Sequence, residues 1–173
     1  MKTKKLSDLT GGALIAALYT ALCFAFPPLS FGAVQLRFSE VLCVLPAIYS
    51  PAIAGLTLGC FLSNLIGLLS GLNPLGFIDC AVGSAATFLA AMATAAIGRR
   101  FRGRRLYLLV PLPPVVFNAL MVGAEMTFLY LGRPSWTGFL LSCGYIAAGE
   151  AACCYLGGLV LLRGCQEILK RKK

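Results

Sequence analysis

Long apolar segments, separated only by proline, glycine and short basic stretches, occupy nearly all of this 173-residue chain. A segment of this kind crosses a bilayer as an α-helix when it contains about 20 residues. Only 12% of the residues are charged, about half the fraction found in a soluble domain. The sequence therefore predicts an all-α membrane protein in which residues 1–173 form a single transmembrane domain.

The breaks between the apolar segments predict a bundle of about six transmembrane helices. The second segment is short, since its roughly 15 residues reach only about 23 Å, against a hydrocarbon core of about 30 Å. The expected helices are 9–26, 35–49, a third that follows the Ser50-Pro51 turn and ends near Gly71, 75–98, 106–131 and 136–162.

Basic residues gather in three clusters, at residues 2–5, 99–105 and 170–173. Cytoplasmic loops carry an excess of lysine and arginine, and only an even number of spans places all three clusters on one side. We therefore expect six spans in a bacterial inner membrane, with cytoplasmic N- and C-termini. Because only Phe101 interrupts the clusters as an aromatic residue, the net charge of +9 indicates contact with lipid headgroups and not with nucleic acid.

The chain lacks the usual patterns of metal sites and catalytic sites. It has eight cysteines without a Cys-x-x-Cys pair, and no histidine, so we expect no metal and no cofactor. It also lacks a G-x-x-x-x-G-K-[ST] phosphate loop, so it cannot hydrolyse ATP through that motif. We expect a binding protein that is not an enzyme and has no catalytic residues.

Four of the six acidic residues fall within the predicted spans. An ionisable group at the centre of a membrane helix costs at least about 2.5 kcal/mol, which makes it a functional candidate. With six spans, all four lie in the outer half or the middle of the membrane, in one layer with several other polar residues. The acids are Glu40, Asp79, Glu125 and Glu150, and the accompanying residues include Arg37, Asn64, Asn118 and Trp136.

The spacing of these residues indicates a common direction. Asn118 and Glu125 are two helical turns apart and so share one face of a helix. If Arg37 pairs with one acid, about three carboxylates have no basic partner. Such a layer suits a ligand that is rich in N–H donors or positively charged. The alternative is that the acids only join neighbouring helices as polar contacts.

Small residues recur at every fourth position of the first predicted helix, at Ala13, Ala17, Ala21 and Ala25. Such a row lets another helix approach closely. The pattern alone does not distinguish packing within the bundle from a partner protein.

Taken together, the chain resembles the substrate-binding S-components of energy-coupling-factor (ECF) transporters, and among them the queuosine-precursor transporter (QueT) family. Short helices, a basic loop after the fourth helix and the alanine row contribute to this resemblance. Its most specific parts lie in 28–46 (PLSFGAVQLRFSEVLCVLP), 59–64 (GCFLSN), 79–84 (DCAVGS), 111–119 (PLPPVVFNA) and Gly149-Glu150.

The resemblance implies uptake of a 7-deazaguanine such as 7-aminomethyl-7-deazaguanine. It also implies docking onto a transmembrane coupling subunit that carries two cytoplasmic ATPase subunits, with Ala13, Ala17 and Ala21 facing the coupling subunit. The four acids would then form the recognition set and Arg37 would orient one of them. Asn118 or Asn64 would meet the ring carbonyl, and Trp136 or Phe128 would stack on the base.

Three alternatives remain at this point. A different S-component substrate, such as a thiamine-like vitamin, is the nearest. A carrier that works alone and is coupled to protons or cations would use the acids as a relay, but a relay needs polar residues in both halves of the membrane. A scaffold protein without a ligand leaves four acids in the membrane unexplained.

Overall fold

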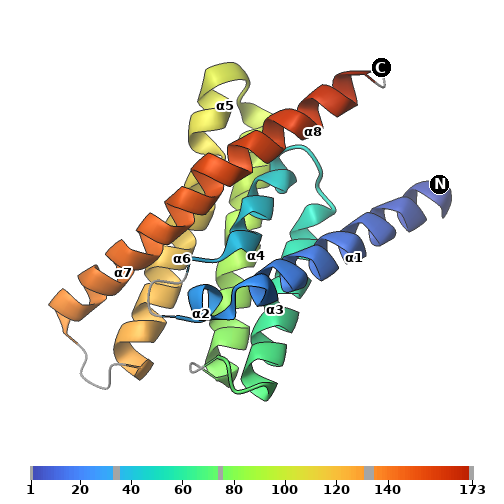
Figure 1. Cartoon of the computed structure of the whole chain (residues 1–173). Helices are drawn as coiled ribbons and strands as arrows, with labels where there is room; N and C mark the ends of the chain where they lie inside the picture. The colour runs from blue at the N-terminus through green and yellow to red at the C-terminus, as the bar shows by residue number, and fades with distance from the viewer. Residues whose placement is uncertain (1, 33–35, 74–75, 131–134, 172–173) are drawn as a thin grey trace.

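The computed structural model describes residues 2–32, 36–73, 76–130 and 135–171, and every secondary-structure element in these ranges is a helix (Figure 1). Most are α-helices, but one 3-10 helix (η1) and two π-helical segments (η2 and η3) interrupt them. In chain order they are α1 (Lys2–Ala25), α2 (Pro27–Ser30), η1 (Phe38–Ala47), α3 (Ala52–Leu69), α4 (Phe77–Arg100), α5 (Gly103–Leu109), α6 (Leu112–Glu125), η2 (Met126–Tyr130), α7 (Trp136–Ala151), η3 (Ala152–Gly158) and α8 (Leu159–Arg171).

Five helical stretches in the described residues are long and apolar enough to cross a membrane. Proline sets several of their limits. Pro27 ends α1, as expected, and Pro111 separates α5 from α6 within the expected helix 106–131. The five stretches are Thr3–Ala25, Ala52–Leu69, Phe77–Arg100, Gly103–Phe128 and Trp136–Arg171.

An α-helix was expected over residues 35–49, and this prediction was wrong. The structure has η1 there, a 3-10 helix of 10 residues, which spans only about 20 Å at about 2 Å per residue. Pro46 lies within η1, and proline cannot continue an α-helical hydrogen-bond ladder. The expected helix ends at Gln35, Leu75 and Leu131 lie outside the described residues.

η1 lies in the centre of the bundle, where it contacts α1, α3, α4, α8 and η3. Glycines on the neighbouring helices allow η1 to pack this closely against them. A Cβ atom on Gly98 of α4 would overlap the carbonyl oxygen of Ala47, and one on Gly158 of η3 would lie 2.8 Å from the Val44 side chain. The middle of the membrane protein is thus built around a short, tightly wound segment.

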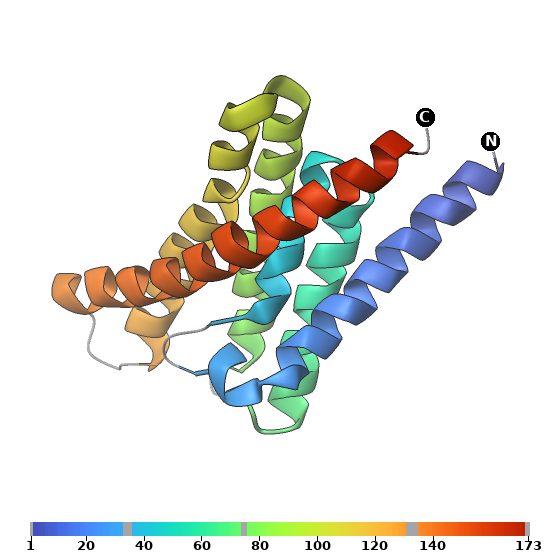
Figure 2. The same ribbon diagram turned by 45° about the horizontal axis from the view of Figure 1, so that its top comes forward.

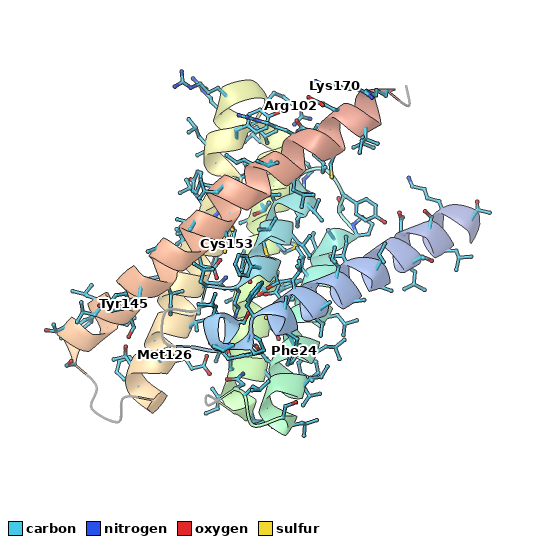
Figure 3. The ribbon with its side chains drawn as sticks, viewed as in Figure 1. Phe24, Arg102, Met126, Tyr145, Cys153 and Lys170 are labelled. Atoms are coloured by element: carbon cyan, nitrogen blue, oxygen red, sulfur yellow. The ribbon has the colours of Figure 1, made fainter. Side chains whose placement is uncertain are left out.

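The two chain ends and α5 lie at one end of the bundle in both ribbon views (Figures 1 and 2). Arg102 and Lys170, from two of the basic clusters, are at that end in Figure 3. The last helical stretch runs obliquely across the bundle over 36 residues and extends beyond the expected end at Leu162. The basic clusters therefore gather at one end of the structure.

The packing of α1 on α3 decides which way the small residues of α1 face. Gly12 and Ala16 face α3, where a Cβ atom on Gly55 would lie 2.5 Å from the Gly12 carbonyl oxygen and one on Gly59 would lie 2.9 Å from that of Ala16. The alanine row lies on another side of α1 and is exposed at Ala13, Ala17 and Ala21, although Ala13 also borders a groove against α3. The row is therefore open at the surface of the described structure.

Candidate functional site

Four acidic side chains from four different elements are buried in the bundle. Glu40 of η1 is 1% exposed, Asp79 of α4 0%, Glu125 of α6 5% and Glu150 of α7 3%. Three of them sit where the α-helical pattern is interrupted: Glu40 lies within η1, Glu125 directly precedes η2, and Glu150 lies two residues before η3. Such irregular turns are frequent at functional sites.

Asp79 forms an ion pair through one of its oxygens, Oδ2, while Oδ1 has no donor among the described residues. Arg37 Nη2 lies 3.2 Å from its Oδ2, and Asn73 Nδ2 donates to the same oxygen at 2.7 Å. Asn64 Nδ2 donates to the main-chain oxygen of Asp79 at 2.9 Å, and Arg37 Nε donates to the carbonyl oxygen of Ser30 at 3.0 Å. Arg37 thus orients one acid, and the structure identifies that acid as Asp79.

Glu40 has donors on both carboxylate oxygens. The hydroxyl of Tyr19 on α1 donates to Oε1, and the Cys43 thiol, one 3-10 turn further along η1, donates to Oε2 at 2.8 Å. The Cys154 thiol reaches the main-chain oxygen of Glu40 at 3.4 Å. Neither Tyr19 nor Cys43 was predicted from the sequence. The signal for Tyr19 was a phenolic hydroxyl within a membrane-length helix, since such a hydroxyl usually has a hydrogen-bond partner when it is buried.

Glu150 and Glu125 are less completely bound. Asn118 Nδ2 donates to Glu150 Oε1 at 2.9 Å, but Glu150 Oε2 has no donor among the described residues. Neither oxygen of Glu125 has a donor within them. A buried acceptor without a hydrogen bond costs about 1–3 kcal/mol, and more when it is charged. Asp79 Oδ1 also lacks a donor there, but Asp79 is paired with Arg37, so these three oxygens are the open ones on acids without an ion pair in the described structure.

The four acids form one electrostatic group. The positive charge of Arg37 acts on Glu125 and Glu150, the charge of Asp79 acts on Glu125, and that of Glu40 acts on Glu150. In Figure 3, Met126, the residue after Glu125, lies nearer the end opposite the termini than Cys153, which is three residues beyond Glu150. We call these residues, Arg37, Glu40, Asp79, Asn118, Glu125 and Glu150, the acidic cluster.

Asn64 is also buried, at 0% exposure, but its amide nitrogen is already used. Its Nδ2 donates to Asp79, as described above, and lies 3.7 Å from the Cys60 sulfur. The Asn64 Oδ1 atom has no donor among the described residues. Asn64 therefore presents its Oδ1 atom as an acceptor. Its Nδ2 atom, which was expected to donate to the ring carbonyl of a ligand, donates to a main-chain oxygen instead.

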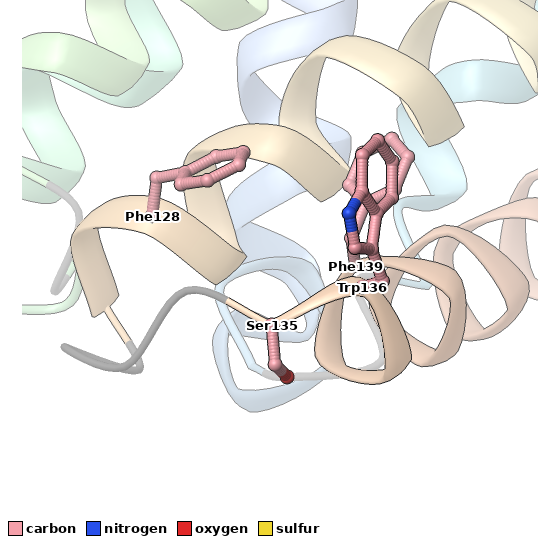
Figure 4. A pocket seen from close by; sticks show the side chains of 4 residues that line it. All are labelled: Phe128, Ser135, Trp136 and Phe139. Carbon is pink, nitrogen blue, oxygen red and sulfur yellow. The ribbon is translucent and has the colours of Figure 1, made fainter.

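Trp136 lies apart from the acidic cluster. It is 81% exposed and lines a depression of about 210 Å³ together with Phe128, Ser135 and Phe139 (Figure 4). Its ring packs edge-on against Phe139, with the centroids 6.2 Å apart. Exposed tryptophan at the end of a membrane helix is typical of the membrane–water interface.

Metal-binding geometry is absent from the described ranges, which contain no group of three or more His, Cys, Asp or Glu side chains able to hold an ion. The eight cysteines are free thiols. The chemistry of the acidic cluster is therefore that of hydrogen bonding and charge.

Apolar membrane-length helices around a buried acidic cluster define a multi-pass membrane protein with an internal polar site. The chain belongs to the QueT transporter family, which matches residues 9–167. It is 27% identical over 165 residues to the queuosine precursor transporter QueT of Lactococcus lactis subsp. cremoris (strain MG1363), covering 93% of this chain and 94% of that protein. No solved structure matches the chain.

Proposed function

We propose that this chain binds a queuosine precursor, a 7-deazaguanine such as 7-aminomethyl-7-deazaguanine, at the acidic cluster and takes part in its import across a bacterial cytoplasmic membrane. The family and the name of the Lactococcus relative support this substrate class. The observation that carries the site is Glu125, a buried carboxylate with no donor on either oxygen among the described residues.

The chemistry of the ligand complements the cluster. The guanine-like edge of a 7-deazaguanine presents an N–H and an exocyclic amine, two donors that one carboxylate can accept side by side. The aminomethyl group adds a cation at neutral pH. Because Arg37 pairs with Asp79, three carboxylates of the cluster have no basic partner among the described residues, and a cationic ligand would offset their charge.

The chain lacks a phosphate-binding loop, so import driven by ATP would use ATPase subunits that are separate from it. We propose that it acts as the S-component of an ECF transporter, with a transmembrane coupling subunit and two cytoplasmic ATPase subunits. The exposed row Ala13, Ala17 and Ala21 is a surface that a partner helix can approach closely. The basic end of the bundle would face the cytoplasm, which puts Glu125 towards the outer side.

Calorimetry on the full chain in detergent tests the substrate, with guanine and thiamine as comparators. We expect one-to-one binding of 7-aminomethyl-7-deazaguanine that falls by about 10- to 100-fold in Glu125→Gln, the value of a charged hydrogen-bond pair. The matched control is Glu167→Gln, at an exposed position on α8, which should bind as the wild type does. Folded protein that binds no deazaguanine would refute the proposed substrate, and thiamine would be the next compound to test.

Uptake assays in cells that contain the coupling and ATPase subunits test the partner surface. Ala17→Leu should abolish uptake and leave binding by the purified chain unchanged, because the larger side chain blocks close helix approach. Ala85→Leu provides the control, since Ala85 is exposed on α4, away from the alanine row. Equal uptake by the two variants would refute the proposed partner surface.

A further inference from the structure

The four acids differ in how their charges and oxygens are bound within the protein, and we infer from this difference how the ligand lies. The ligand lies lengthwise along α6, with a two-donor edge on Glu125 and its cationic end on Glu150. Asp79 and Glu40 form a frame that the ligand does not need to contact. This assignment rests on the proposed function and adds to it the orientation of the ligand.

Asp79 and Glu40 are set aside because Arg37 already neutralises Asp79 and both oxygens of Glu40 already accept hydrogen bonds. Asp79 Oδ2 accepts from both Arg37 and Asn73, whereas Asp79 Oδ1 has no donor among the described residues. Glu40 accepts from Tyr19 and Cys43, one on each oxygen. A ligand that replaced these donors would leave Arg37 without its counter-charge or Tyr19 without its acceptor in a buried region. Such a loss would offset the new contact.

Glu125 suits a two-donor edge because both of its oxygens lack donors among the described residues while the side chain is 5% exposed. It lies on the side of the cluster where Arg37 already neutralises Asp79. A planar edge with two parallel N–H groups satisfies both oxygens at once, in the bidentate geometry that carboxylates accept.

Glu150 suits a single cationic donor. Asn118 occupies its Oε1, so only Oε2 lacks a donor within the described ranges. The neighbouring carboxylate of Glu40 adds negative charge at this position, and the donors of Glu40 are a hydroxyl and a thiol, which carry no positive charge. An ammonium group placed here would pair with Glu150 and would also be attracted by the nearby charge of Glu40.

The separation of the two open carboxylates favours an elongated ligand. Asn118 holds Glu150 and lies on the same α-helix as Glu125, seven residues away. Seven residues correspond to about 10 Å along the helix axis. A bicyclic base with an aminomethyl arm carries its guanine-like edge and its ammonium group at opposite ends, as this arrangement requires.

The test pairs each carboxylate with the ligand group assigned to it, by calorimetry on the full chain in detergent. The ligands are 7-aminomethyl-7-deazaguanine, its analogue with a nitrile in place of the aminomethyl group, and its analogue without the 2-amino group. In the wild type, each change in the ligand should weaken binding by about 10- to 100-fold. In Glu150→Gln, replacing the aminomethyl group by the nitrile should no longer weaken binding, whereas in Glu125→Gln it still should. Removing the 2-amino group should have no effect in Glu125→Gln and should still weaken binding in Glu150→Gln.

Several results would overturn the assignment. Penalties that stay the same in both variants would show that neither carboxylate contacts the group assigned to it, and an exchanged pattern would show the opposite orientation. In both cases wild-type binding remains and the proposed substrate stands. No binding of any of the three ligands by folded wild type would instead refute the proposed substrate. Glu125→Asp and Glu150→Asp replace the glutamine variants if those fail to fold.

Discussion

The two sides of the acidic cluster are equally buried but differ in how their charges are bound. On the α4 side, Asp79 has an arginine and asparagines around it. On the α6–α7 side, Glu125 has no donor among the described residues and Glu150 has one, from Asn118. The first side has the features of a structural ion pair and the second those of a binding surface.

This difference shows that burial alone does not identify a binding residue. A buried carboxylate that is fully paired stabilises or orients the fold, and its loss is felt in folding. A buried carboxylate without donors contributes little to folding and keeps its hydrogen-bonding capacity for a ligand. The two sides should therefore respond in opposite ways to the same kind of substitution.

Asp79→Asn should have the largest effect on folding. It leaves the Arg37 guanidinium, 4% exposed, without its counter-charge, and breaking one partner of a buried pair costs about 3–5 kcal/mol. We expect a clear loss of thermal stability in detergent, or of folded yield on size-exclusion chromatography.

The control for this variant is the double substitution Arg37→Met with Asp79→Asn, which removes both charges. Replacing a buried pair by uncharged groups is often nearly neutral, so the double variant should recover most of the lost stability. An Asp79→Asn protein as stable as the wild type would contradict the assignment of this side as structural.

Glu125→Gln should show the opposite pattern, with little change in folding and a large change in ligand response. Removing a buried carboxylate that has no donors in the described structure should leave the unfolding temperature without ligand equal to that of the wild type or above it. The shift produced by 7-aminomethyl-7-deazaguanine should fall by the equivalent of about 1.5–3 kcal/mol. Destabilisation as strong as that of Asp79→Asn would remove the distinction between the two sides.

Gly83→Ala should disturb the α4 side through packing alone. A Cβ atom at Gly83 would lie 2.8 Å from Asp79 Oδ1 and 2.9 Å from Asn64 Nδ2, so one of these side chains has to move. Overpacking of this kind costs about 1–3 kcal/mol, measurable as a lower unfolding temperature. The matched control is Gly144→Ala on α7, where a Cβ atom meets nothing within 4 Å and where alanine should be neutral or slightly stabilising. Equal stability of the two variants would contradict the prediction.

Tyr19→Phe should have the smallest effect of the four. It removes the hydroxyl that donates to Glu40 Oε1 while the Cys43 thiol still donates to Oε2. We expect a loss of about 1 kcal/mol in stability. Tyr107→Phe is the comparison, because the Tyr107 hydroxyl bonds Gln166 in a half-buried position and should matter less. A larger effect at Tyr107 would show that the Glu40 contact is not important for the fold.

The sequence predicted the helical class, several helix limits and the set of buried acids for clear physical reasons. Apolar length indicates membrane helices, and proline ends them, as at Pro27. Charged groups within such helices have to face the interior, so the burial of Glu125 and Glu150 followed from their positions. The shared face of Asn118 and Glu125 followed from helical periodicity, and both side chains are 5% exposed.

Other features depend on contacts that a linear pattern does not contain. The rotation of each helix in the bundle decides which acid pairs with Arg37. It also decides that Tyr19 and Cys43 donate to Glu40. The lipid-facing and interior faces of these helices are both apolar, so the pattern fixes this rotation only weakly. The exposure of Trp136 was missed for the same reason. The 3-10 winding of η1 was missed although Pro46 lies within the segment and disfavours an α-helix there.

The π-helical turns have a consequence for changes in chain length. A turn that closes from i to i+5 contains one residue more than an α-helical turn. Deleting one residue within Ala152–Gly158 would therefore restore α-helical winding and leave the faces of α7 and α8 aligned. The same deletion within α4 would rotate everything beyond it by about 100°. Single-residue insertions and deletions in homologous proteins should accordingly collect in η2 and η3, directly after the two carboxylates that remain open.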